Sequence, residues 1–356
     1  MIRSRDVFAY VACSGPQGVG TIRFYRLDSA SGALEFVHQS AEMRNPSYLV
    51  VHPNKRTLYV VNEMAEFAGQ PTGALSAYAI DPETWQLSLL NQQPSMGTSP
   101  CYVGLDGTGR YAQVANFGSG SVAICPLCAD GSLGPASDVA QHPTLGDRVP
   151  RAHSVRMDPT NRLAVACDLG LDRVYLYRVD LEHGRLVANE QPYLQLAAGA
   201  GPRHSEFHPN GKWLYIINEL GNTLTVLSYD AAQCRMTELQ TISTLPADFF
   251  GTSYCGDVHV SRDGRYLYGT NRAHNTIVCM AIDQTHGTLE PFAWEPCQGD
   301  FPRNFALDPS GRFLFSATHN TNNIVGFAVD RGTGRLTPSG FNLQVTVPLC
   351  IKFVMA

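Results

Sequence analysis

The chain has 356 residues, of which 44% are hydrophobic and 16% are charged, and its formal net charge is −5. This charge, without any run of Lys or Arg, offers no basic face for nucleic acid or for an anionic membrane. No apolar stretch nears the roughly 18 residues of a membrane-spanning helix, and the Met1-Ile2-Arg3 start lacks the apolar core of a signal peptide. We therefore expect a cytoplasmic protein without nucleic-acid or membrane partners.

The chain begins with an apolar segment, Val7 to Ala12, that resembles a second strand without a first. Beyond it, one pattern recurs: an apolar run, a tight turn rich in Pro, Asn, Asp and Gly, and a second apolar run. The turn and the second run are found at 52–63, 105–117, 157–169, 260–272 and 307–319. The rest of the chain is organised as imperfect copies of one unit.

The clearest copy is 201–230. Its turn, His208-Pro209-Asn210-Gly211, predicts an antiparallel hairpin, because Pro presets φ and Asn-Gly tolerates positive φ. Strands are expected at 213–217, 223–229 and 236–242, which gives a four-stranded antiparallel unit with the run before the turn. His208 is expected to be solvated.

Asn218 marks the repeat. Its equivalents are Cys13, Asn62, Asn116, Asp168, Asn271 and Thr318, and successive markers are 49, 54, 52, 50, 53 and 47 residues apart. Seven four-stranded copies at this period predict an all-β fold, a seven-bladed β-propeller with four-stranded antiparallel blades. The mostly Asn series itself is interpreted as structural, with side chains that cap turns.

The two ends of the chain complete each other. The last segment, 345–356, reads as a first strand that no second strand follows, and Val7 to Ala12 reads as a second strand without a first. We expect the C-terminal strand to pair with the N-terminal strand and to close the ring, so that no sheet edge stays open there. Residues 1–356 are then one propeller domain.

Three segments exceed the repeat, at 64–73, 141–153 and 245–256. Because the inner strand and its neighbour are antiparallel, inner-strand starts and second-strand ends lie on the same rim of the channel, and all three segments belong to it. The same rim should gather polar side chains from both kinds of strand end: Arg151, His153, Arg203, His204, Asp257, Arg303, Asn304, Glu63, Glu219 and Arg272. Several arginines at one mouth indicate an anionic ligand held by bidentate contacts.

The segments GPRHSEFHPNGKWLYIINEL and FPRNFALDPSGRFLFSATHN resemble the seven-bladed lactonase family, which contains propeller-type 6-phosphogluconolactonases and fungal 3-carboxy-cis,cis-muconate lactonizing enzymes. The resemblance covers essentially the whole chain. It implies a propeller without cofactor or metal, with a catalytic cluster at one channel mouth: His153 in PRAHSV, Arg203 in GPRH, Glu219 in INEL and Arg272 in TNRAHN. Substrate-binding roles are expected for His204, Arg303, Arg151, Asn304 and Asp257.

This sequence departs from the family's pattern at two places. The approach to Asp257 reads GTSYCGDVHV where many relatives are Ala/Glu-rich, and the start FAYVACSG lacks the usual Gly-Thr-Tyr signature. Substrate identity is the property that these departures affect.

The activity expected from the resemblance is hydrolysis of an anionic sugar lactone, 6-phosphogluconolactone. His153, with an unperturbed pKa near 6.5, or Glu219 would act as the base, and arginines would hold the oxyanion and the phosphate. Cycloisomerisation of a carboxymuconate needs the same residue types and stays open.

Two further alternatives and the oligomeric state also stay open. A non-catalytic YVTN-type binding propeller would favour a secretion signal and an apolar rim. A calcium-dependent six-bladed lactonase would use the carboxylates and amides of Glu63, Asn116, Asp168, Asn218 and Asp257, but seven repeats and the arginines at the mouth oppose it. Monomer and homodimer are equally compatible with a closed ring.

Overall fold

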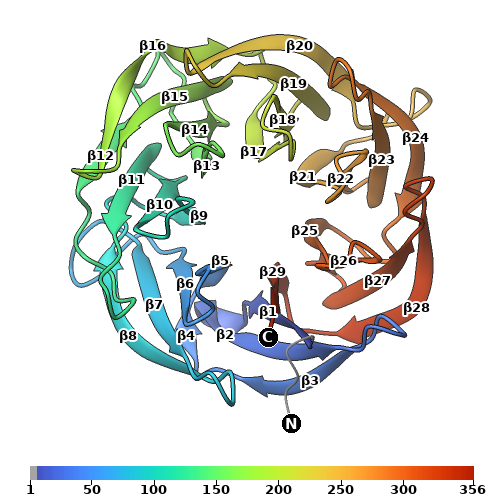
Figure 1. Cartoon of the computed structure of the whole chain (residues 1–356), viewed down its shortest axis with the longest axis horizontal. Coiled ribbons are helices and arrows are strands. Elements are labelled where there is room, and N and C mark those ends of the chain that lie inside the picture. The colour runs from blue at the N-terminus through green and yellow to red at the C-terminus, as the bar shows by residue number, and fades with distance from the viewer. Residues whose placement is uncertain (1–5) are drawn as a thin grey trace.

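Residues 6–356, which the computed structural model describes, form seven β-sheets arranged in a ring around a central channel (Figure 1). Successive strands in each sheet are antiparallel, and the path runs from an inner strand at the channel to an outer strand at the periphery. The expected all-β, seven-bladed propeller is confirmed. Within the described part of the chain, no helix is long and apolar enough to cross a membrane.

Blade 1 contains β29 (Pro348–Met355), β1 (Val7–Cys13), β2 (Val19–Leu27) and β3 (Leu34–Gln39), with the short β4 (Met43–Arg44) paired to β2 and the 3₁₀ helix η1 (Pro16–Gly18) before β2. Blade 2 contains β5 (Pro46–Val51), β6 (Thr57–Asn62), β7 (Ala74–Ile80) and β8 (Leu87–Pro94). Blade 3 contains β9 (Pro100–Leu105), β10 (Tyr111–Asn116), β11 (Ser121–Pro126) and β12 (Asp138–Gln141). Blade 4 contains β13 (Ala152–Met157), β14 (Leu163–Asp168), β15 (Arg173–Asp180) and β16 (Arg185–Gln195).

Blade 5 contains β17 (Pro202–Phe207), β18 (Trp213–Asn218), β19 (Thr223–Asp230) and β20 (Arg235–Ser243), which match the strands expected from the repeat. Blade 6 contains β21 (Tyr254–Val260), β22 (Tyr266–Arg272), β23 (Thr276–Ile282) and β24 (Leu289–Pro296). Blade 7 contains β25 (Pro302–Leu307), β26 (Phe313–Thr318), β27 (Asn323–Val329) and β28 (Leu336–Gln344).

The ring closes between the two ends of the chain. β29 pairs antiparallel with β1, with Ala9 opposite Phe353 and Tyr10 opposite Lys352. β29 also contacts the inner strands β25 and β5 on either side, so it serves as the inner strand of blade 1. The expected closure is confirmed.

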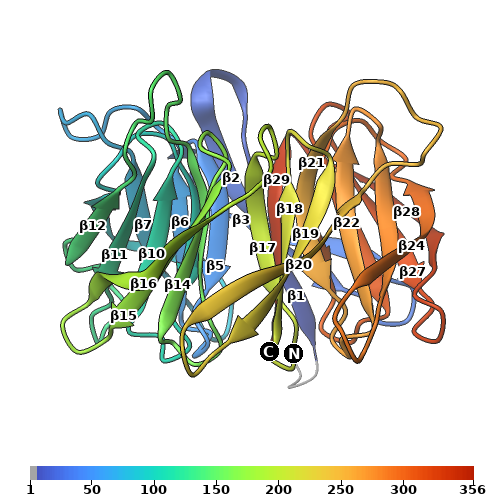
Figure 2. The same ribbon diagram turned by 90° about the horizontal axis from the view of Figure 1, so that it is seen from above.

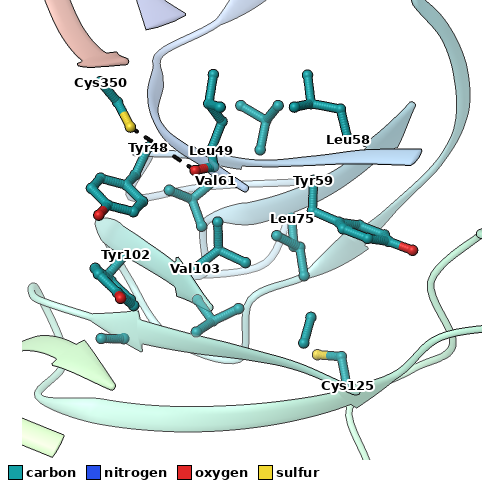
Figure 3. Packing of buried hydrophobic residues seen from close by; sticks show 14 of the residues in the cluster. Tyr48, Leu49, Leu58, Tyr59, Val61, Leu75, Tyr102, Val103, Cys125 and Cys350 are labelled. Atoms are coloured by element: carbon teal, nitrogen blue, oxygen red, sulfur yellow. Dashed lines mark hydrogen bonds between the residues drawn. The ribbon is translucent and has the colours of Figure 1, made fainter. Parts of the chain in front are cut away.

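The core lies between neighbouring blades. Leu49, Val61 and Leu75 of blade 2 face Val103 and Cys125 of blade 3, and all five side chains are at most 1% exposed (Figure 3). Such blades have no stable isolated form, because each sheet covers the apolar face of the next. The repeat therefore buries its core only when the ring is complete.

The turns between inner and second strands hold the blades together at the rim where the chain ends (Figure 2). His208 is 4% exposed and its Nε2 lies 2.8 Å from the carbonyl oxygen of Gly264 in the next blade. The expectation that His208 is solvated is wrong, because the turn packs against blade 6.

The Asn markers are buried and make structural hydrogen bonds, but those of blades 3 and 6 bond to the backbone of the preceding blade and not only within their own turns as expected. Asn116 donates its amide to the carbonyl of Ser95 at 2.9 Å, and Asn271 donates to the carbonyl of Thr244 at 2.9 Å. These bonds tie the end of a second strand to the chain leaving the outer strand of the preceding blade, which keeps the opposite rim in a fixed shape.

Candidate active site

Three charged side chains meet at the channel mouth opposite the C-terminal end of β29. Arg203 lies at the start of β17, Glu219 follows β18, and Arg272 ends β22. Arg203 Nε donates to Glu219 Oε2 at 2.9 Å, and Arg272 Nη2 lies 2.7 Å from the same oxygen. The two arginines are 2% and 4% exposed, so one carboxylate bridges two buried guanidinium groups.

A β-bulge in β21 orients both arginines. The pairing of β21 with β22 shifts register between Cys255 and Val258, which turns backbone carbonyls away from the ladder. Arg203 Nη1 donates to the carbonyl of Gly256 at 2.7 Å, and Arg272 Nη2 donates to that of Cys255 at 2.7 Å. The positions of both guanidinium groups are thus fixed by the backbone as well as by Glu219.

These contacts set the charge states of the bridge. Burial would raise the pKa of Glu219, but the positive charges of Arg203 and Arg272 outweigh it and hold that pKa below its ordinary value. Burial, together with the nearby charge of Arg203, lowers the pKa of Arg272 to about 10. The bridge therefore carries one negative and two positive charges at neutral pH.

His153 lies beside this bridge, in β13. The residue is 6% exposed, and its Nδ1 is buried without a hydrogen-bond partner among residues 6–356. Its ring stands at 65° to that of His204, with centroids 5.2 Å apart, and edge-on to Phe117 at 5.6 Å. Burial and the charge of Arg203 lower the pKa of His153 well below 6.5, so the imidazole is neutral at pH 7 and the expected unperturbed pKa is corrected.

A second layer of polar side chains supports the cluster from below. His204 Nδ1 lies 2.6 Å from Asp257 Oδ1, and Asn304 donates its amide to the other carboxylate oxygen. Burial and Arg203 lower the pKa of His204 to about 4, whereas the partners of Asp257 hold its pKa well below the ordinary value although burial opposes them. The layer therefore consists of a neutral imidazole on an ionised carboxylate.

All three members of this layer are 1% to 4% exposed. Their expected substrate-binding roles remain predictions, and their contacts favour support of Arg203 and His153 instead.

Two more arginines complete the mouth. The side chain of Arg303 is 26% exposed, and its Nη2 lies 3.9 Å from Glu63 Oε2. Arg151 places its guanidinium over the Phe117 ring at 5.3 Å and donates Nη1 to the carbonyl of Gly118 at 3.0 Å. Of the five residues predicted for substrate binding, these two are held most loosely by the protein.

The predictions from the sequence missed two aromatic rings at this mouth, Phe117 and Phe301. Phe301 lies under the Arg272 guanidinium at 5.0 Å, with a left-handed φ of 65° that is uncommon for a bulky residue. Their places in the repeat could have revealed them, because Phe117 follows the Asn116 marker and Phe301 precedes the first residue of an inner strand.

The described residues, 6–356, contain no group of three or more His, Cys, Asp or Glu side chains arranged to hold a metal ion. The fold does bring the four predicted catalytic residues together at this mouth. Their catalytic roles remain predictions.

Comparison with known proteins places the chain among lactonases. The family model described as "Lactonase, 7-bladed beta-propeller" matches residues 8–353. The 6-phosphogluconolactonase of Bacillus subtilis is 35% identical over 97% of both chains, and that of Serratia proteamaculans is 30% identical over 79% of this chain and 80% of the other. The solved structure of the Pseudomonas aeruginosa periplasmic gluconolactonase superimposes with a TM-score of 0.91 and 33% identity over 98% of this chain and 99% of that one. The chain belongs to the seven-bladed β-propeller lactonase family.

Proposed function

We propose that this lactonase hydrolyses 6-phosphogluconolactone. The observation that carries the proposal is the pair of buried arginines bridged by Glu219 beside the neutral His153. The names of the relatives support a sugar lactone as the substrate class, since they include 6-phosphogluconolactonases and a gluconolactonase. The arginines further out supply the charge that a phosphate requires.

His153 acts as the base in this proposal. Hydrolysis requires a water to lose a proton while its oxygen attacks C1 of the lactone. The neutral imidazole accepts that proton and returns it to the ring oxygen when the C1–O bond breaks. Glu219 is less suited to the task, because its Oε2 already accepts from two guanidinium groups and its pKa is lowered.

The two bridged arginines stabilise the negative charge that develops on the C1 oxygen. Arg203 and Arg272 are held by Glu219 and by the carbonyls of Gly256 and Cys255, so their remaining N–H donors need little reorganisation during the reaction. A preorganised donor of this kind contributes on the order of 3 kcal/mol to transition-state stabilisation.

Arg303 and Arg151 bind the phosphate. Arg303 is the less constrained of the two, since its closest carboxylate lies 3.9 Å away and the side chain is partly exposed. A dianionic phosphate is a stronger partner for a guanidinium than a distant carboxylate at a solvated mouth.

The test is hydrolysis of freshly generated 6-phosphogluconolactone, coupled to 6-phosphogluconate dehydrogenase and corrected for the spontaneous rate. We expect turnover that EDTA does not change and that His153→Asn abolishes. Glucono-δ-lactone, which lacks the phosphate, serves as the comparison substrate. Arg303→Met should raise KM for the phosphorylated lactone alone.

Arg262→Met is the matched control, because Arg262 is exposed in the turn after β21 and donates to the carbonyl of Pro309, on the opposite rim. This variant should have the same kcat and KM as the parent on both substrates. Absence of turnover on both lactones, with conversion of a carboxymuconate, would replace the proposal by the cycloisomerase alternative.

A further inference from the structure

The seven inner strands place one structurally equivalent residue each in a ring nearer the opposite mouth of the channel. In each blade, this residue pairs with the second-strand residue that lies three positions before the repeat marker. The seven members of the ring are Val50, Gly104, Arg156, Glu206, His259, Ala306 and Lys352. The ring lies two residues beyond the layer that contains His204 and Asn304, or about 7 Å along the strands. Four members are ionisable and the other three are small or apolar.

The charges of this ring do not balance. Glu206 Oε2 lies 2.9 Å from Arg156 Nη2 and 3.4 Å from His259 Nδ1, so the single carboxylate of the ring is already shared. His259 Nε2 lies 3.4 Å from Asp257 Oδ2 in the layer above. Lys352 has no carboxylate partner in the ring, and it donates Nζ to the Tyr48 hydroxyl at 3.0 Å and lies over that ring at 4.7 Å.

The small members leave space on both sides of Lys352. Between Lys352 and Arg156, where Val50 and Gly104 occupy the ring, a cavity of about 330 Å³ also borders Tyr48 and Tyr102. Between Lys352 and His259, next to Ala306, a second cavity of about 230 Å³ opens. An ammonium group carries three N–H donors, and Tyr48 takes one of those of Lys352. The partly buried side chain thus brings a positive charge with spare donors to the edge of both cavities.

We propose that the far mouth of the channel is a second anion-binding site, in which Lys352 and Arg156 hold a phosphate-sized oxyanion in the cavity beside Val50 and Gly104. The ligand is free phosphate or the phosphate group of a monoester. The site is separate from the catalytic mouth, because the hydrogen-bonded layer of His204, Asp257 and Asn304 lies between them along the inner strands. The proposal does not depend on which lactone the catalytic mouth accepts.

Titration of the intact protein with inorganic phosphate, followed by calorimetry at low ionic strength and pH 7, tests this site. Lys352→Met keeps an unbranched stem over Tyr48 and removes the charge, and it should weaken phosphate binding at this site at least tenfold. Arg303→Met, at the other mouth, should leave it unchanged. Lys55→Met is the matched control, since Lys55 is exposed near the same rim and donates to the carbonyl of Ala356.

Two further measurements keep the proposal falsifiable if Lys352→Met folds poorly. Val50→Glu puts a carboxylate into the same cavity and should abolish binding there. A crystal grown in phosphate should show the oxyanion between Lys352 and Arg156, and 6-phosphogluconate should compete with it if monoesters are accepted. The proposal is overturned if Arg303→Met removes phosphate binding completely, or if an equal concentration of chloride displaces the phosphate. Either result would show an adventitious ion only.

Discussion

Replacing Arg203 by Met separates the chemical role of the bridge from its structural role. Methionine keeps an unbranched apolar stem of similar length, so packing in the channel is largely preserved. The substitution removes the Nε contact with Glu219 and the Nη1 bond to the Gly256 carbonyl. It leaves Glu219 with Arg272 as its remaining bridging partner.

The expected cost in stability follows from these contacts. Removing one partner of a buried ion pair costs about 3 to 5 kcal/mol. Because Glu219 keeps Arg272 and its side chain is 19% exposed, the cost should lie at the low end of that range. At about 2.1 cal/mol/K of unfolding entropy per residue, 356 residues give roughly 750 cal/mol/K, so about 3 kcal/mol lowers the thermal midpoint by about 4 °C. If Arg203 contributed no more than an exposed arginine, the substitution would leave the thermal midpoint unchanged.

The expected effect on catalysis is larger. Loss of one preorganised oxyanion donor lowers kcat by about 10²- to 10³-fold. Initial rates on 6-phosphogluconolactone, measured at a temperature where the variant is folded, give kcat, and scanning calorimetry through the unfolding transition gives the thermal midpoint. Arg262→Met on the opposite rim should change neither.

Two results would refute this reasoning. A variant that loses about 4 °C but keeps kcat within tenfold of the parent would show that Arg203 only supports the channel. An unchanged midpoint with normal activity would show that the buried bridge contributes nothing measurable.

Three further outcomes are expected. Although burial opposes it, Asp257 and Glu206 raise the pKa of His259 from 6.5 to about 9. The protonated imidazole therefore adds up to about 3 kcal/mol to the free energy of unfolding. This contribution is complete below pH 6.5 and is lost as the pH rises through about 9. Urea unfolding across that range should show the loss in the parent but not in His259→Gln, and parallel curves would contradict it. Because the pKa of His153 lies well below 6.5, kcat/KM for glucono-δ-lactone, which carries no titrating phosphate, should stay level as the pH falls through 6.5, and an acid limb there would show a solvated imidazole. Cys128 is the one exposed cysteine within residues 6–356, so a thiol reagent should label one site per native chain and ten after denaturation.

The fold was predictable because its signals are local and repeated. The turn before Trp213 and the spacing of the Asn218 markers each depend on a few neighbouring residues, and seven copies reinforce one another. The closure of the ring followed from two incomplete copies, since a strand without a partner must find one. His208 was misjudged because its burial depends on the next blade, which no local pattern describes.

The candidate site was predictable in position but not in depth. Topology fixes the rim at which Arg203, Glu219 and Arg272 emerge, and the fold brings them together. It does not fix how far each side chain lies below the mouth. Asp257 was grouped with the substrate-binding residues, whereas the bulge in β21 directs its carboxylate to His204 inside the channel. The register shift recurs between the inner and second strands of every blade, but the partner of the Asp257 carboxylate lies in the neighbouring blade, which no local pattern describes.

The closing strand connects this buried layer to the integrity of the ring. The side chain of Asn304 donates to Asp257 and accepts the backbone N–H of Ile351 in β29 at 2.8 Å. Lys352, the next residue, faces Tyr10 across the closure and supplies a charge to the far mouth. A strand that only sealed the propeller could be apolar throughout its inner half, since apolar contacts suffice to bury a sheet face. Because β29 also satisfies Asn304 and presents Lys352, misplacing it would disturb the support of His204 and the far mouth together, and closure of the ring and the arrangement of the channel are therefore one structural event.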